Sequence, residues 1–215
     1  WIGRPGIIAA PTMQNSPDLG IKSDPVAAKA LLDEYLAEKG ITAADMDITL
    51  MYNTSSGHQK IAEAIQQMWK TTLGIDVKVT NQEWKVFLET TKDPVATPQI
   101  FRMGWCMDYP DENNFLRDVF VYGGSNNPRG GGGLNWGPGD PYYDDWETTL
   151  LEAAKEKDTA KRLDMYRLAE ETLVKTEAAV IPIYFYTNVQ VTKPYVIRTY
   201  AAGGHQDYVF WDLTQ

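Results

Sequence analysis

The fold of this chain is decided by the stretch Ile48-Thr49-Leu50-Met51-Tyr52, a short apolar run that is typical of a buried strand. A helix is predicted to follow over about 57–73, because apolar residues recur there at helical spacing and a glycine comes next. Apolar and polar residues then alternate over 75–80, which predicts a strand with one face in water. Strand, helix and strand in this order predict an α/β fold.

The same kind of pattern continues on both sides of this stretch. Upstream, Ser23-Asp24-Pro25 predicts the start of a helix, since a capping side chain precedes a proline, and Gly40 predicts its end. Downstream, periodicity predicts further helices over 84–91, 111–121, 142–156 and 159–176. Further strands are expected over 99–105, 180–186, 189–192 and 208–211, with 180–186 and 189–192 paired.

These elements predict an α/β lobe with a mixed β-sheet flanked by helices. Residues 1–22 are rich in proline and glycine and are expected to form an irregular lead-in. No composition shift predicts a boundary that would divide the chain into independent domains.

Composition excludes several classes of function. The 215 residues carry a formal net charge of −9 with no basic stripe, so a nucleic acid is not an expected partner. The single cysteine, Cys106, excludes an intrachain disulfide, and no apolar run is long enough to predict a membrane span. His58 and His205 have no Cys or His partners at metal spacing, so no metal site is predicted.

The most unusual segment is Gly104-Trp105-Cys106-Met107-Asp108-Tyr109, in which two aromatic residues flank an acid. A carboxylate held between rings, partly shielded from water, is costly to desolvate alone. An incoming ammonium group relieves that cost through a charge-assisted hydrogen bond of about 1.5–3 kcal/mol. Asp108 is therefore a candidate receptor for the α-amino group of a peptide. The alternative is that Asp108 caps the following helix or lies in solvent.

This segment resembles the signature of the peptide-binding proteins of ABC transporters, in extracellular solute-binding protein family 5. Residues 179–186 and Val191-Thr192-Lys193-Pro194 are similar to the family's "IPxYYY" and "VKPxV" runs, and the helix after Asp24-Pro25 resembles its "YDPEKAKKLL" helix. The resemblance implies a lobe like those of type II periplasmic binding proteins. Residues 1–215 are then expected to be the carboxy-terminal lobe of a two-lobed protein whose N-terminal lobe is absent here.

The resemblance also implies roles for individual residues. The acid that matches Asp108 pairs with the amino terminus of the ligand, and Trp105 lines a side-chain pocket. Arg102 is expected to help neutralise the carboxyl terminus, because a planar guanidinium fits a carboxylate. The alternative for Arg102 is a strand-edge arginine that pairs with a surface acid. A second arginine of the family has no match here, because Asp93-Pro94 occupies that place.

Five further residues are candidates for lining the ligand. Cys106 and Tyr109 belong to the segment around Asp108, and Trp136 lies in a glycine-rich loop whose alternative role is a plain surface loop. Tyr184 and Tyr186 alternate with Phe185, so the two tyrosines are expected to point the same way. Packing in the core is the alternative for these rings.

The expected function is non-enzymatic: the substrate-binding component of an ABC importer, which captures short peptides between two lobes and delivers them to the permease subunits. No cofactor is expected. The expected location is the periplasmic or extracellular face of the cytoplasmic membrane, with or without a lipid anchor. The alternatives are a family member that binds an oligosaccharide or a nickel complex, a glycoside hydrolase that uses Asp108 and Asp111, and a structural or adhesion domain.

Overall fold

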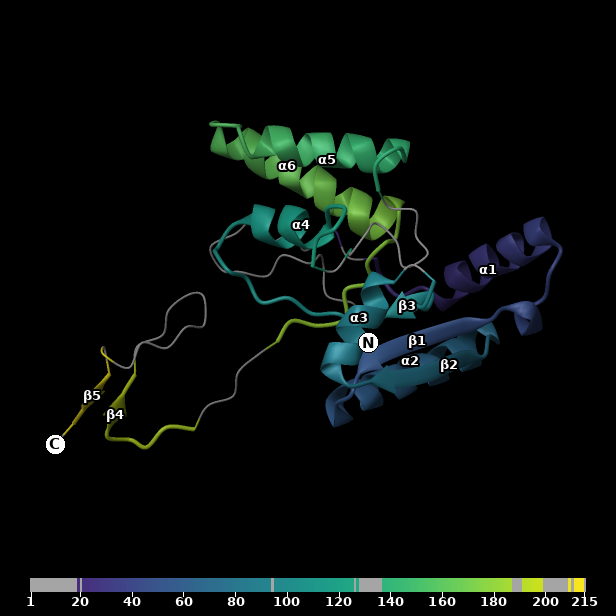
Figure 1. Cartoon of the computed structure of the whole chain (residues 1–215), viewed down its shortest axis with the longest axis horizontal. Helices are drawn as coiled ribbons and strands as arrows, with labels where there is room; N and C mark the ends of the chain where they lie inside the picture. The colour runs from purple at the N-terminus through teal and green to yellow at the C-terminus, as the bar shows by residue number, and fades with distance from the viewer. Residues whose placement is uncertain are drawn as a thin grey trace. The chain divides into compact units, whose positions relative to one another are not determined.

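The computed structural model describes residues 19, 21–93, 95–125, 127, 137–186, 191–198, 209 and 211–214 (Figure 1). The chain divides into two compact units. The first comprises Trp1–Ile21, Cys106–Asp118 and Trp146–Gln215, and the second comprises Lys22–Trp105 and Val119–Asp145. Because the chain passes between the units more than once, no single point in the sequence separates them.

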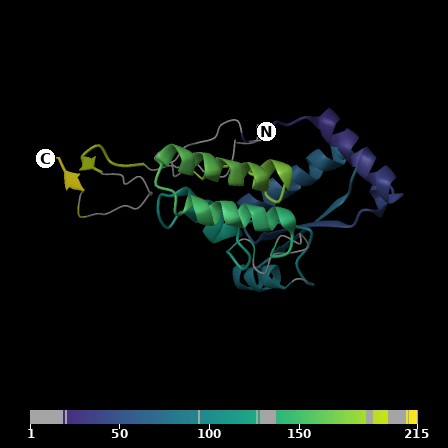
Figure 2. The same ribbon diagram turned by 90° about the horizontal axis from the view of Figure 1, so that it is seen from above.

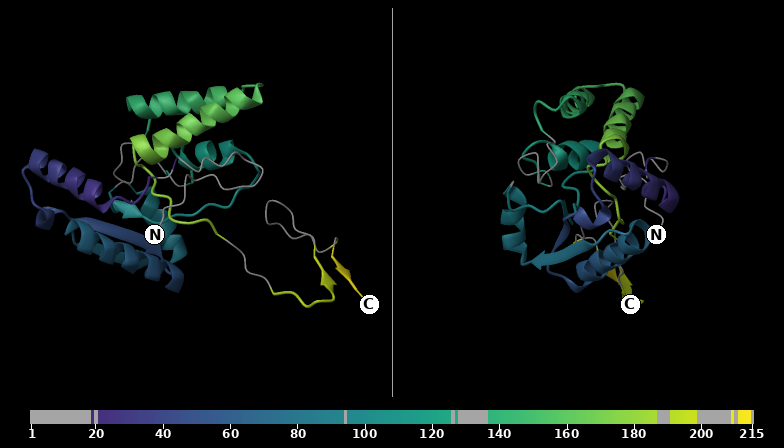
Figure 3. Two further views of the ribbon diagram at one scale, coloured as in Figure 1. Left: turned by 180° about the vertical axis from the view of Figure 1, so that it is seen from behind. Right: turned by 90° about the vertical axis from the view of Figure 1, so that its right-hand side faces the viewer.

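The second unit contains the strand–helix–strand pattern that the sequence predicts. Its sheet is formed by β1 (Ile48–Asn53), β2 (Val77–Gln82) and β3 (Ile100–Phe101), which are all parallel and lie in the order β2-β1-β3. Helix α2 (Ser56–Leu73) connects β1 to β2 and runs along these strands (Figure 3), and α3 (Trp84–Lys92) connects β2 to β3. The third strand is shorter than the predicted 99–105.

The two connecting helices cover opposite faces of this sheet. Leu50 of β1 packs in one buried cluster with Ala62 of α2. Met51 points the other way, on the face where Phe87 of α3, which is fully buried, meets the ring of Phe101 edge to face at 6.4 Å. Right-handed crossovers produce this arrangement, because the chain moves in opposite directions along the sheet after β1 and after β2.

Helix α1 (Pro25–Lys39) begins and ends where the sequence predicts. The side chain of Asp24 accepts hydrogen bonds from the backbone N–H groups of Val26 and Ala27. Gly40 ends the helix with φ 64°, a backbone conformation that glycine adopts without strain. A single 3-10 turn, η1 (Ala43–Asp45), then leads into β1.

The first unit is mainly helical. It contains most of α4 (Glu112–Phe120), the second half of α5 (Pro141–Ala153), α6 (Thr159–Glu171) and the π-helical turn η2 (Thr172–Thr176). Helices α5 and α6 lie side by side (Figure 2), and the indole Nε1 of Trp146 donates a 3.0 Å hydrogen bond to the carbonyl of Ala169. The predicted helices are thus confirmed, with a change from α to π geometry at Thr172.

The last described elements differ from the prediction. Residues 180–186 form no strand, and 189–190 lie outside the described residues. A strand is held by hydrogen bonds to a neighbour, and no described segment pairs with 180–186. Instead, β4 (Val196–Ile197) pairs antiparallel with β5 (Asp212–Leu213), just beyond the predicted 208–211. The described strands therefore form one parallel and one antiparallel sheet rather than a single mixed sheet.

Candidate ligand-binding site

Asp108 lies in a bent segment just before α4, and its side chain is exposed. The expectation that this carboxylate is partly shielded from water is therefore wrong for the chain described here. The reason is local: β3 ends at Phe101, and residues 102–107 have no regular structure. Asp108 thus stands in a turn and not at the end of a strand.

Asn114 of α4 holds Asp108 from two sides. Its side-chain oxygen accepts a 3.0 Å hydrogen bond from the backbone N–H of Asp108, and its Nδ2 donates to Asp108 Oδ2 at 3.3 Å. Asn114 itself is 1% exposed. The position of the exposed carboxylate is therefore set by a buried amide that carries no charge.

Asp111, and not Asp108, caps the following helix. Its Oδ1 accepts a 2.9 Å hydrogen bond from the backbone N–H of Asn113, in the first turn of α4. Both of its carboxylate oxygens also accept hydrogen bonds of 2.7 Å from Nη2 of Arg162 in α6. Arg162 lies 3.7 Å from the buried carboxylate of Glu112 and stacks over the ring of Tyr166 at 4.7 Å. The charge of Asp111 is thus balanced within the fold.

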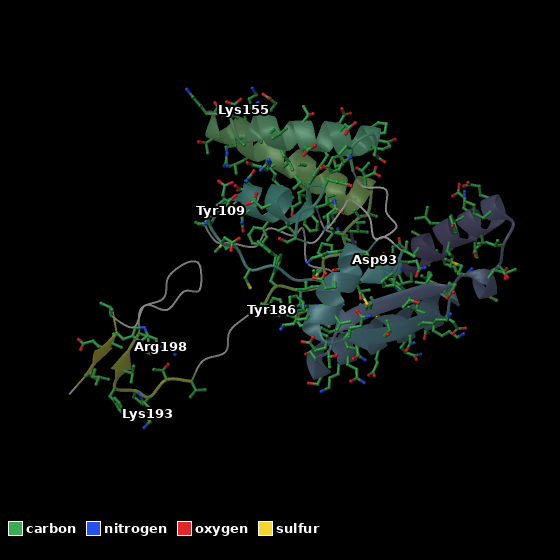
Figure 4. The ribbon with its side chains drawn as sticks, viewed as in Figure 1. Asp93, Tyr109, Lys155, Tyr186, Lys193 and Arg198 are labelled. Atoms are coloured by element: carbon green, nitrogen blue, oxygen red, sulfur yellow. The ribbon has the colours of Figure 1, made fainter. Side chains whose placement is uncertain are left out.

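Tyr109, which lies beside α4 (Figure 4), and Asp118 of that helix form the third part of this network. The phenol of Tyr109 donates a 2.6 Å hydrogen bond to Asp118 Oδ2 and accepts one of 2.8 Å from Nδ2 of Asn113. Asn114 also donates to Asp118, at 3.2 Å. Burial, together with the hydrogen bond to Asp118, raises the pKa of Tyr109, so the phenol stays a donor. Its hydroxyl group is therefore engaged by the fold, although Tyr109 as a residue is 41% exposed.

These contacts distinguish three neighbouring acids. Asp111 has an arginine partner, and Asp118 has three neutral donors and Arg117 at 3.9 Å. In the part of the chain that the structure describes, no lysine or arginine pairs with Asp108. Asp108 is therefore the acid of this network whose negative charge is left for an incoming cation.

Arg102 directly follows β3 at the carboxyl edge of the parallel sheet. Its backbone N–H donates to the carbonyl of Met51 at 2.8 Å, and its Nη1 donates to Oδ1 of Asn53, the last residue of β1, at 3.4 Å. This is the point where the strand order reverses, and α/β sheets bind ligands at such points. Asn53 was not predicted as a site residue, although its place at the end of the central strand was a usable signal.

The other candidates are distributed unevenly. Trp105 is half-buried and belongs to the unit that contains the sheet, whereas Cys106, a free and exposed thiol, is the first residue of the second segment of the other unit. The rings of Tyr184 and Tyr186 meet edge to face with their centroids 4.9 Å apart, so the two side chains do lie together although this segment is not a strand. Trp136 lies outside the described residues.

A family model of bacterial extracellular solute-binding proteins, family 5 (middle region), matches residues 5–127. The chain belongs to this family. Within the family, it is 36% identical over 164 residues to the periplasmic oligopeptide-binding protein OppA of Escherichia coli, covering 76% of this chain and 28% of that protein. It is 31% identical over 210 residues to the periplasmic murein peptide-binding protein MppA of Escherichia coli, covering 98% of this chain and 36% of that protein.

A solved structure supports the same fold for this family 5 chain. The unliganded open form of the murein tripeptide-binding protein MppA superposes with a TM-score of 0.68 at 30% identity, over 95% of this chain and 36% of that one. The predicted α/β lobe of the type II periplasmic binding proteins is therefore confirmed. The chain spans about a third of the length of these relatives.

Two further findings concern the described part of this family 5 chain. None of its helices is both long enough and apolar enough to cross a membrane. No group of described His, Cys, Asp and Glu residues has a geometry that suits a metal ion. The acids around α4 are instead held by Arg162, by amides and by the Tyr109 phenol.

Proposed function

We propose that this protein is the substrate-binding component of an ABC importer that captures short peptides. The observation that carries the proposal is Asp108, an acid fixed by a neutral amide within a network where its neighbours already have partners. The α-ammonium group of a peptide supplies the missing positive charge in a charge-assisted hydrogen bond. The names of the oligopeptide-binding and murein peptide-binding relatives support the same ligand class.

The other site residues have complementary roles in this proposal. Arg102 receives the carboxyl end of the peptide, which its planar guanidinium fits, and Asn53 supports that side chain. Trp105 forms the wall of a side-chain pocket. The remaining lining residues are Cys106, Tyr109, Trp136, Tyr184 and Tyr186. The side-chain pockets are large enough to hold water as well, so they accept many different side chains. The peptide backbone forms hydrogen bonds with the protein much as an added strand does.

In the complete protein, residues 1–215 form the carboxy-terminal lobe, and an N-terminal lobe closes over the peptide by a hinge motion. Closure removes water from around Asp108, which is exposed in the chain described here. The closed form then docks on the permease subunits at the periplasmic or extracellular face of the membrane, with a lipid anchor where the host uses one.

The protein acts by binding and not by catalysis. A glycoside hydrolase needs two carboxyl groups that flank the bond to be broken. Of the two acids considered for that role, Asp111 already caps α4 and is paired with Arg162 at 2.7 Å. Its carboxylate is therefore committed to the fold.

Calorimetry on the full-length protein tests the proposal. A peptide with a free amino terminus should bind about 10–100-fold more tightly than its N-acetylated form, which is the effect of one charge-assisted hydrogen bond. Asp108→Asn should remove this difference, whereas Asp47→Asn, at an exposed surface pair with Lys78, should keep it. Equal binding of the two peptide forms by the unchanged protein would contradict the proposal.

Mass spectrometry of the ligand that copurifies with the full-length protein separates peptides from other cargo. A mixture of short peptides supports the proposal. An oligosaccharide or a nickel complex as the bound species would place the protein with another ligand class of the same family.

A further inference from the structure

We infer that Asn114 is a positioning residue, which holds the Asp108 carboxylate in its receiving orientation before any ligand arrives. The inference rests on the proposed function, because it concerns the same ammonium receptor. Asn114 itself, a residue of α4, is not expected to touch the ligand, since it is 1% exposed.

The hold is formed by two different atoms of one buried amide. Asn114 Oδ1 accepts from the backbone N–H of Asp108 at 3.0 Å, which fixes the main chain of the turn. Asn114 Nδ2 donates to Asp108 Oδ2 at 3.3 Å, which fixes the side chain. Rotation of the carboxylate away from this position leaves a buried donor with one acceptor fewer, and such a loss is unfavourable.

The orientation of the amide is itself determined by its surroundings. Its Nδ2 donates not only to Asp108 but also to Asp118 Oδ2, at 3.2 Å. Asp118 is in turn fixed by the phenol of Tyr109 at 2.6 Å. Two carboxylates accept from one end of the Asn114 amide, and a backbone N–H donates to the other end. Only one assignment of the amide nitrogen and oxygen satisfies all three contacts.

An uncharged holder has a consequence that a lysine or an arginine would not have. A cation at this place would balance the charge of Asp108, as Arg162 does for Asp111. The amide orients the carboxylate and leaves its negative charge for the ligand. Orientation before binding lowers the entropic cost of association, and this should appear as tighter binding of a free amino terminus.

Asn113 provides a matched control in the same turn of α4. Its Nδ2 donates to Tyr109 Oη at 2.8 Å, and its Oδ1 accepts from the phenol of Tyr166 at 3.5 Å. Its hydrogen bonds are made with the same network but not with Asp108. Asn113→Leu and Asn114→Leu remove the same chemical group from neighbouring positions, so a difference between them reports on Asp108.

The test compares two probes, trialanine and N-acetyl-trialanine, by calorimetry on the full-length protein. The measured quantity is the ratio of the two dissociation constants, N-acetylated over free. Asn114→Leu should lower this ratio by about 10-fold, and Asn113→Leu should keep it within about 3-fold of the unchanged protein. A purely structural role for Asn114 would weaken both probes alike and leave the ratio unchanged.

The outcomes separate this inference from the proposed function. If the unchanged protein binds neither probe, or binds both equally, the peptide-receptor function itself is overturned. If the unchanged protein prefers trialanine and Asn114→Leu keeps that preference, only the positioning role is overturned. Should Asn114→Leu fail to fold, the same ratio is measured on Asn114→Ala, which removes the amide without adding bulk, and an unchanged ratio again rejects the inference.

Discussion

Acidic residues stand at the starts of both α6 and α4 in the first unit, but their bonding partners differ. At the start of α6, Glu156 accepts hydrogen bonds from the backbone N–H groups of Lys157 and Asp158, at 2.8 and 2.9 Å, and pairs with Lys161 Nζ at 2.7 Å. Asp158 caps the helix by accepting from the N–H of Lys161 at 2.9 Å. Each of these acids is thus engaged by the fold.

At the start of α4, only some of the acids are balanced in this way. Asp111 caps the helix and pairs with Arg162, whereas among the described residues Asp108 is held only by the neutral amide of Asn114. An acid before a helix is common, because the helix N-terminus favours negative charge. The comparison teaches that the donors around an acid, and not its place in the sequence, distinguish a structural acid from a receptor.

The largest loss of stability is expected from removing Arg162, the cation that balances the negative charges at the start of α4. Arg162→Met leaves Asp111 and the buried Glu112, whose side chain is 6% exposed, without their positive partner. The free energy of unfolding should fall by about 2–3 kcal/mol, because a desolvated carboxylate loses its counter-charge. Urea denaturation of the full-length protein at neutral pH measures this change.

The neighbouring Lys161 is the control for this substitution, since it serves the start of α6 with a side chain that is 69% exposed. Lys161→Met should leave the free energy of unfolding almost unchanged at neutral pH, as expected for an exposed ion pair. Equal losses from the two substitutions would show that the two helix starts are balanced in the same way.

A smaller loss of stability should distinguish Asp111 from Asp108 at the start of α4. Asp111→Asn weakens the pairing with Arg162 and should lower the free energy of unfolding by about 1–2 kcal/mol. Asp108→Asn changes an exposed side chain that has no cationic partner among the described residues, so it should alter stability by less than about 0.5 kcal/mol while it weakens peptide binding. Denaturation curves of both variants test this order, and a larger loss for Asp108→Asn would reverse the assignment of roles.

The sheet of the second unit was predictable because its signals are local. Periodicity and a terminal glycine located β1, α2 and β2 to within a few residues, and a capping aspartate located α1. The strand predicted over 180–186 failed for the opposite reason. Its β-forming residues are a local signal, but a strand also needs a hydrogen-bonding neighbour, which no local pattern supplies.

The candidate site was predictable only in part. The motif around Asp108 identified the acid, but neither motif nor spacing indicated that Asn114 holds it or that Arg162 takes Asp111 instead. Arg162 lies far from Asp111 in sequence, and such pairs follow from how helices pack. The exposure of Asp108 could not be read from its aromatic neighbours, because Tyr109 directs its phenol to Asp118.

The smallest effect concerns the pH response of the start of α6. Its hydrogen bond with Lys161, followed by that with the N–H of Asp158, lowers the pKa of Glu156 from 4.5 to about 2. A carboxylate whose pKa is depressed on folding contributes stability at pH values above its ordinary pKa, and this contribution is lost as the pH falls from about 4.5 through about 2.

An NMR titration of Glu156 should therefore show a midpoint near 2, and Lys161→Met should move that midpoint upward. The midpoint should remain below 4.5, because the two backbone donors stay in place. A midpoint that does not respond to Lys161→Met would mean that the backbone N–H groups alone lower the pKa of Glu156. The difference between the starts of α4 and α6 would then depend on Arg162 and Asn114 and not on Lys161.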